Sequence, residues 1–220
     1  MQYFIYLFAT FILYSFFGWL MESILSFIKT KKFINRGFLI GPYCPIYGIG
    51  CICLIFLLKK YSNDLMALFI IGTVICSIIE YLTSLILEKL FKTRWWDYSH
   101  LPFNINGRIC LLYSVLFGLG GFIMLIVNPI IQNFMISIPK LLFNIIICII
   151  IIFFIIDCII SFNIINKLKL ATQEIYKDNT EEITQKISSV IHEKSKQFKR
   201  VIQAFPNAYT KNIYKKKFRK

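Results

Sequence analysis

The chain has 220 residues, of which 57% are hydrophobic and 16% charged, and its formal net charge is +14 at pH 7. A soluble domain carries about a quarter charged residues, whereas here the charges are concentrated in short connecting segments and near the C-terminal end. The composition therefore excludes an ordinary soluble domain and predicts a polytopic membrane protein. The apolar runs are continuous, which favours an all-α bundle of membrane-spanning helices.

Five apolar runs reach the roughly 20 residues that a membrane-spanning helix needs. They cover approximately residues 3–28, 39–58, 65–87, 109–127 and 141–165. The first run has no basic segment before it and is longer than the apolar part of a signal peptide, so we expect it to be a span. The sequence thus predicts a transmembrane helical domain over residues 1–166 and a basic tail over residues 167–220.

The positive charges predict an orientation for these spans. Twenty-two of the 25 Lys and Arg residues lie in the loop after the first run, the loop after the third run and the tail. Cytoplasmic segments of membrane proteins are enriched in Lys and Arg. We therefore expect the N-terminus outside the cell, the tail inside, and five crossings between them.

Polar residues gather near the predicted cytoplasmic face. Glu22 and Glu80 lie in the inner halves of the first and third runs, where an ionised carboxylate costs about 2.5–3.5 kcal/mol. The two basic loops bring further polar and aromatic side chains to the same depth. The predicted substrate-binding residues are Glu22, Asn35, Arg36, Tyr43, Tyr47, Glu80, Trp95, Trp96, Asp97, Asn104 and Arg108.

Two interpretations of this group stay open. Arg36 and Arg108 are suited to bind an anionic group, with Glu22 and Glu80 as proton carriers or cation ligands. Alternatively, the arginines neutralise the carboxylates only to hold the helices together. The intramembrane Asp157 is equally open between a packing role and a functional one.

The start of the second run is irregular. Pro42 and Pro45 remove backbone donors, and four glycines follow one another at short spacing between residues 37 and 50. A helix broken at membrane depth is tolerated only where protein packs against it or where it lines a wet cavity. We therefore expect this segment to be covered by other parts of the protein.

Several chemistries have no sequence support. The seven cysteines lie in or beside the predicted spans without zinc-ligand spacing, so we predict neither a metal site nor a disulfide framework, and no cofactor. The pattern GxxxxGK[ST] is absent from the sequence, which indicates that the chain is not itself an ATPase.

The tail has its own pattern. Asn179 and Glu182 form a capping box, and apolar residues then recur at helical spacing until Pro206. We expect an amphipathic cytoplasmic helix followed by a basic end that docks on anionic lipids. Self-association or a protein partner is the rival for this helix, and nucleic acid is not expected.

Three stretches carry a resemblance to a known family. They are FFGWLMES at residues 16–23, NRGFLIGPYCPIYGIG at 35–50, and LEKLFKTRWWDYSHLPFNINGRICLLYSVLFGLGG at 87–121. Together they resemble the putative ABC-transporter type IV family of bacterial membrane proteins, the CmpB type, over roughly residues 3–126. The resemblance implies a multi-pass permease of the bacterial cytoplasmic membrane, and it implies a separate ATPase subunit as partner.

Three functions follow as hypotheses. The first is a permease-like protein whose polar site binds a polar or anionic solute or a lipid headgroup. The second is a membrane enzyme acting on lipid headgroups or lipid-linked substrates, with Glu22 or Glu80 as general base and Arg36 and Arg108 holding phosphate. The third is a non-catalytic membrane scaffold or regulator. A homo-oligomer is expected if transport requires inverted repeats, since five spans cannot be divided evenly.

Overall fold

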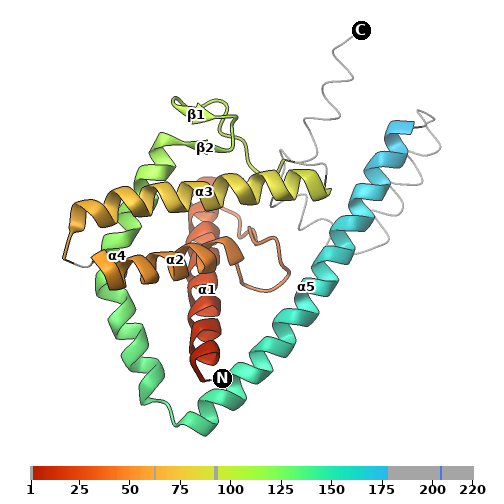
Figure 1. Ribbon diagram of the computed structural model, residues 1–220. Coiled ribbons are helices and arrows are strands. Elements are labelled where there is room, and N and C mark those ends of the chain that lie inside the picture. Colours follow the sequence, from red (N-terminus) through yellow and green to blue (C-terminus); the bar gives the residue numbers. More distant parts are fainter. Residues whose placement is uncertain (1, 62, 92–93, 178–203, 205–220) are drawn as a thin grey trace.

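The computed structural model describes residues 2–61, 63–91, 94–177 and 204. These residues form five helices and one short hairpin, so the described part of the chain has the predicted all-α class. The helices are α1 (Gln2–Thr30), α2 (Pro45–Tyr61), α3 (Leu65–Phe91), α4 (Leu111–Ser137) and α5 (Lys140–Lys177). Strands β1 (Asn104–Ile105) and β2 (Ile109–Cys110) pair antiparallel between α3 and α4 (Figure 1).

Four of these helices are long and apolar enough to cross a membrane. They are α1, α3, α4 and the Lys140–Asn166 part of α5, each of 27 or 29 residues. The chain is therefore a multi-pass membrane protein. The predicted N-outside orientation is not tested by this arrangement and stays a prediction.

The predicted second span differs from the other four. Helix α2 begins at Pro45 instead of residue 39, and its apolar part is Pro45–Leu57. Its 17 residues rise about 25 Å, which is less than the roughly 30 Å of a bilayer core. The proline at position 45 cannot donate to a preceding turn and disfavours a helical conformation of Cys44, so the helix starts there.

Helices α4 and α5 extend beyond their predicted ends. The fourth predicted span ends at residue 127, but α4 continues through Pro129 to Ser137. Asn128 is buried and accepts a hydrogen bond from the Tyr14 hydroxyl of α1 at 3.4 Å, so its polar side chain is satisfied inside the bundle. Helix α5 continues past residue 166, the predicted end of the membrane domain. The predicted tail helix after Asn179 lies outside the described residues apart from Ala204.

Close contacts at glycines show how the first three helices run. A side chain at Gly18 of α1 would collide with the Tyr47 ring of α2, and one at Gly48 of α2 would collide with Phe11 and Ser15 of α1. These contacts place the start of α2 against the middle of α1. Gly50 lies near Cys76 and Gly72 lies near Leu54, so α2 and α3 pack antiparallel to each other. Figure 1 shows these two helices side by side, with α1 crossing them.

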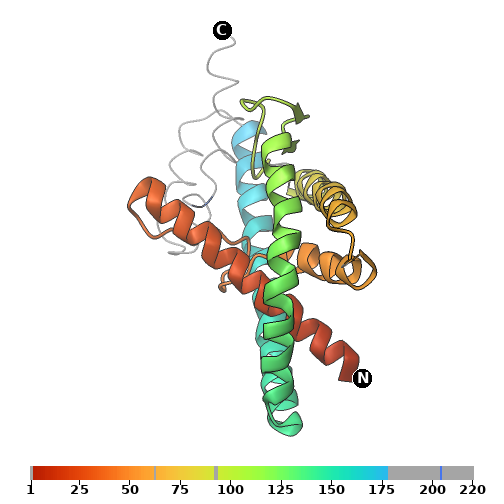
Figure 2. The same ribbon diagram turned by 90° about the vertical axis from the view of Figure 1, so that its left-hand side faces the viewer.

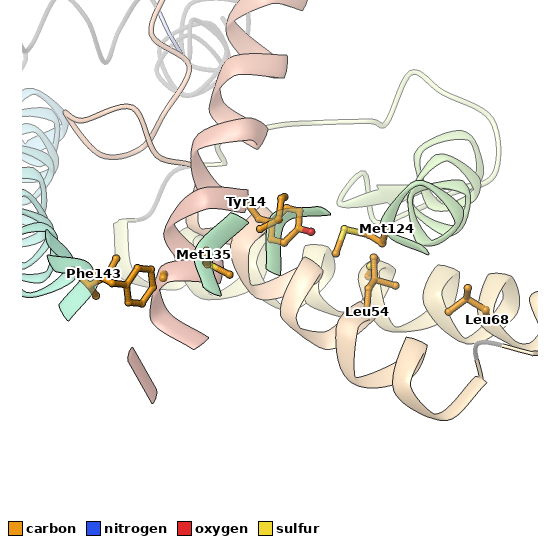
Figure 3. Close-up of a cluster of buried hydrophobic side chains, with 10 residues drawn as sticks. Tyr14, Leu54, Leu68, Met124, Met135 and Phe143 are labelled. Carbon is orange, nitrogen blue, oxygen red and sulfur yellow. The ribbon is translucent and has the colours of Figure 1, made fainter. Parts of the chain in front are cut away.

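One apolar cluster joins all five helices. Its labelled members in Figure 3 are Tyr14 of α1, Leu54 of α2, Leu68 of α3, Met124 and Met135 of α4, and Phe143 of α5. A second cluster of Phe91, Trp95 and Ile165 packs the end of α3 against α5. Figure 2 shows α1 running obliquely to α4, so the helices do not form a parallel bundle. The two clusters fix the segments that carry the polar residues.

Candidate functional site

Each of the two intramembrane glutamates receives a hydrogen bond from a tyrosine. The Tyr47 hydroxyl, near the start of α2, donates to Glu22 Oε1 of α1 at 2.6 Å. The Tyr98 hydroxyl, in the loop after α3, donates to Glu80 Oε1 of α3 at 3.1 Å. Glu22 and Glu80 each lie in the C-terminal half of their own helix. We call Glu22, Tyr47, Glu80 and Tyr98 the Glu–Tyr cluster.

The two pairs interact with each other electrostatically. Burial raises the pKa of Tyr98, and the charge of Glu80, its hydrogen bond, the stacked Tyr113 ring and the charge of Glu22 raise it further. The effect of Glu22 shows that the two halves of the cluster lie within electrostatic reach. The raised pKa keeps the Tyr98 phenol protonated near neutral pH, so it remains a hydrogen-bond donor to Glu80.

One carboxyl oxygen of Glu80 is not used in the bond to Tyr98. Its side chain is deeply buried, with 5% of the residue exposed, and its Oε2 has no hydrogen-bond partner among the residues that the structure describes. Buried polar atoms in proteins are nearly always hydrogen-bonded, and an unsatisfied one costs about 1–3 kcal/mol. With respect to the described residues, this carboxyl oxygen is therefore an acceptor available to a further group.

Arg108 does not neutralise either intramembrane glutamate. Its Nη1 lies 2.6 Å from Glu88 Oε2 and also donates to the Ser84 hydroxyl at 3.3 Å. Arg94 binds the same Glu88 oxygen through Nε at 3.3 Å. Within the described residues, the carboxylates of Glu22 and Glu80 thus pair with phenols, and the two arginines of the second basic loop pair with Glu88. The sequence places Glu88 at the helix end but gives no sign of its central position between two arginines.

Other polar side chains of the loop over residues 94–110 hydrogen-bond to the backbone of the same loop and hold its conformation. Asn104 Oδ1 accepts from Gly107 N at 3.0 Å, and its amide nitrogen donates to the Leu101 carbonyl at 2.7 Å. Trp96 Nε1 donates to the Arg108 carbonyl at 3.0 Å. Gly107 has φ +66°, a conformation that favours glycine.

Asp97 and Trp95 also fix this loop, Asp97 by polar contacts and Trp95 by apolar packing. Asp97 Oδ1 accepts from the backbone and side chain of Ser99 and lies 3.6 Å from Arg94 Nη1. Trp95 is buried against Phe38 and Phe91 in the second apolar cluster. The predicted binding residues Trp95, Trp96, Asp97 and Asn104 therefore hold the loop that carries Tyr98.

The loop over residues 31–44 is held by a carboxylate from α5. Asp157 Oδ1 accepts from Ile40 N at 3.0 Å, and Asp157 Oδ2 accepts from Gly41 N at 2.8 Å. Ser161, one turn further along α5, donates to Asp157 Oδ1 at 2.9 Å and accepts from Ile40 N at 3.1 Å. These bonds give Asp157 a structural role, because it satisfies backbone donors at the irregular start of α2. They also bear out the expectation that other parts of the protein cover this segment.

Asn35 and Tyr43 belong to the same loop. Asn35 Oδ1 accepts from Trp19 Nε1 at 2.7 Å, and Asn35 Nδ2 donates to the Ile40 carbonyl at 2.9 Å. The Tyr43 ring packs edge-on against Phe154 of α5. Burial and then the charge of Asp157 raise the pKa of Tyr43. Both predicted binding residues thus shape the approach to α2, which in turn carries Tyr47.

Arg36 is the one predicted cation that stays available. It is half-buried, and it forms no hydrogen bond or ion pair with any residue in the described ranges. Burial, followed by the charge of Glu22, raises the pKa of Cys44 to about 12, while Arg36 acts in the opposite direction. Glu22 and Arg36 thus lie within electrostatic reach of the same thiol, which places Arg36 near the Glu–Tyr cluster.

Tyr98 is the member of the cluster that sequence reasoning did not select. It appears in the sequence as one of three neighbouring aromatic residues suited to a membrane interface, beside Trp95 and Trp96. Its partner Glu80 is 18 residues away across the end of α3, so no helical spacing relates the two.

Comparison with known proteins identifies a family. The family model described as putative ABC-transporter type IV matches residues 9–162. This range contains all eleven predicted binding residues and the whole Glu–Tyr cluster. No curated protein and no solved structure matches the chain. Because the match covers more than half of the sequence, the chain belongs to the putative ABC-transporter type IV family.

Proposed function

We propose that this member of the putative ABC-transporter type IV family is a permease-like protein that binds a polar or anionic solute, or a lipid headgroup, at the Glu–Tyr cluster. The observation that carries the proposal is the buried Glu80 carboxyl. One of its oxygens accepts from Tyr98, and the other has no partner among the described residues. A ligand that supplies a hydroxyl or amino group would satisfy that oxygen.

Arg36 supports an anionic part of the same ligand. A guanidinium group binds phosphate or carboxylate oxygens through two parallel hydrogen bonds. Arg108, the other predicted anion-binding residue, is already engaged with Glu88. The proposed ligand therefore combines hydrogen-bond donors for Glu80 with a negative charge for Arg36, a combination found in phosphorylated polar solutes and lipid headgroups.

The proposal includes an orientation and an energy source. The basic segments over residues 29–36 and 89–108 favour the cytoplasmic face for the cluster. Because the sequence lacks the GxxxxGK[ST] pattern, ATP hydrolysis would come from a separate ATPase subunit on that face of the bacterial cytoplasmic membrane. Family membership supports such a partner.

Native mass spectrometry of the full chain in lipid nanodiscs tests the proposal. The wild type is expected to retain a polar or anionic small molecule or lipid, and Glu80→Gln and Tyr98→Phe are expected to lose it. Tyr113→Phe is the matched control, because the Tyr113 ring stacks on Tyr98, whereas the hydroxyl that donates to Glu80 is that of Tyr98. Retention by Glu80→Gln and Tyr98→Phe at the wild-type level would refute a site at this cluster.

A further inference from the structure

The hairpin between α3 and α4 presents apolar side chains outward. Phe103 is 80% exposed and Ile105 is 57% exposed. Strand register places Ile105 opposite Ile109, and Asn104 opposite the fully buried Cys110. Since cross-strand partners share a face, the inner face of the hairpin carries Asn104 and Cys110 and the outer face carries the two isoleucines. We call Phe103, Ile105 and Ile109 the hairpin tip.

The conformation of this hairpin is fixed and strained. Phe103 and Asn106 have φ values of +51° and +54°, in the left-handed region that side chains other than glycine rarely adopt. A bulky residue there costs about 1–3 kcal/mol and persists only where the surroundings hold it. Two bonds hold Asn106. Its backbone carbonyl accepts from Arg94 Nη1, and its side-chain Nδ2 donates to the Tyr81 hydroxyl. Phe103 is held separately, because its carbonyl accepts from Leu111 N.

The hairpin tip is continuous with an apolar stripe on α4. Strand β2 ends at Cys110 and α4 begins at the next residue, and Leu111 N donates to the Phe103 carbonyl at 3.2 Å. Exposed residues then recur at intervals of three or four positions along one face of α4. They are Leu112, Leu116, Leu119, Ile123, Ile126, Ile130 and Phe134. This spacing is that of a single helix face, and α4 is one of the four helices suited to cross the membrane.

We propose that the hairpin tip inserts into the lipid bilayer at the boundary between headgroups and acyl chains. An exposed apolar stripe on a membrane-spanning helix faces acyl chains, and Phe103 is hydrogen-bonded to the first residue of that helix. Phe and Leu side chains of segments that lie in the membrane interface are buried to this depth. Figure 1 shows β1 and β2 directly above the start of α4, beyond the end of the helix. The occupant of the outer face of the hairpin is therefore lipid, and not the ATPase subunit discussed above.

This insertion would fix the position of Tyr98. The Tyr98 backbone N–H donates to the Gly107 carbonyl of the hairpin at 2.8 Å, and the Tyr98 hydroxyl bonds to Glu80. A hairpin anchored in the headgroup region holds one half of the Glu–Tyr cluster at a constant depth. The inference stands on exposure and backbone geometry, so it does not depend on the proposed ligand of that cluster.

Photo-crosslinking identifies the occupant directly. Benzoylphenylalanine replaces Phe103 in the full chain, which keeps an aromatic ring at the site, and size-exclusion chromatography verifies folding. The protein is irradiated in nanodiscs, and intact-mass spectrometry measures any adduct. We expect a lipid-mass adduct in a yield comparable to that from benzoylphenylalanine at Phe134 on the α4 stripe. The same replacement at His100, an exposed polar position in the same loop, is expected to give a several-fold lower lipid yield.

Two results would overturn the inference. One is the absence of a lipid adduct from position 103 while position 134 gives one. The other is a crosslink from position 103 to a second protein when intact cells are irradiated, which would assign the hairpin tip to a protein partner.

Discussion

The two polar loops of this protein perform similar tasks by different means. The loop over residues 31–44 leads into α2, where Tyr47 donates to Glu22. The loop over residues 94–110 carries Tyr98, which donates to Glu80. The bonds from Asp157 and Ser161 to the first loop join residues 116–121 positions apart. The side-chain bonds that hold the second loop join residues at most 25 positions apart.

The first loop is therefore held partly by a distant helix, whereas the polar contacts of the second loop come from residues near it in the sequence. The first loop needs α5 in place to satisfy the amides of Ile40 and Gly41. The polar contacts of the second loop come from the end of α3 and from its own side chains, while its Trp95 ring packs in the second apolar cluster with Ile165 of α5. Changes at Asp157 of α5 are therefore expected to affect the first loop and to leave the second largely intact.

The largest expected effect comes from Asp157→Ala. The change leaves the amides of Ile40 and Gly41 without their carboxylate acceptor, at a cost of about 2 kcal/mol or more in the free energy of unfolding. The melting temperature in nanodiscs measures the loss. Hydrogen exchange should increase over residues 31–44 and stay unchanged over residues 94–110.

Asp64→Ala is the control for that experiment. Asp64 also accepts from a backbone amide, that of Ala67 at 2.9 Å, but at an exposed helix start. We expect a loss of about 1 kcal/mol there. Equal losses for the two variants would contradict the special role of the α5 carboxylate.

A smaller and local effect is expected from Arg108→Ala. The change removes the 2.6 Å ion pair with Glu88, which keeps Arg94 as a second partner. We expect a loss of about 1–2 kcal/mol, because charge-assisted hydrogen bonds are worth somewhat more than neutral ones but Glu88 is partly exposed. Hydrogen exchange over residues 94–110 should increase, with residues 31–44 unaffected.

The double variant sharpens the comparison between the loops. If the loops are independent, the losses from Asp157→Ala and Arg108→Ala should add to within about 0.5 kcal/mol. A larger departure from additivity would show that the two anchors are coupled through the Glu–Tyr cluster.

The smallest effect is expected from Tyr98→Phe, and its pH dependence is specific. Removing one hydrogen bond to Glu80 should cost about 1 kcal/mol. Burial and Glu80 raise the pKa of Tyr98 above the ordinary value of 10.0. The protonated phenol therefore contributes its full stability below the unfolded pKa, and this contribution is lost as pH rises from the unfolded pKa through the higher folded pKa.

Melting curves of Tyr98→Phe and the wild type test that sign. The difference between them should stay constant between about pH 8 and 9.5 and shrink as pH rises above about 10. A difference that does not change between about pH 9 and 11 would mean that folding leaves the pKa of the Tyr98 phenol at its ordinary value.

Much of the fold was predictable because the length and hydropathy of an apolar run identify a membrane-spanning helix. Residues 3–28 and 65–87 were predicted as spans, and α1 and α3 extend them by only a few residues. The prediction was least accurate at prolines. Pro45 starts α2 six residues later than expected, whereas α4 continues through Pro129, because the effect of a proline depends on whether neighbouring residues satisfy the freed backbone groups.

The amino-acid sequence alone predicted a multi-pass all-α membrane protein with Glu22 and Glu80 in its apolar helices, since a charge inside a long hydrophobic run is visible without coordinates. It also carried the motifs of the family. The partners of the charged groups became known from the folded structure. Phenols bind Glu22 and Glu80, Arg108 binds Glu88, and Asp157 binds the loop before α2. These choices depend on helix packing and loop conformation, which bring together side chains that no sequence spacing relates.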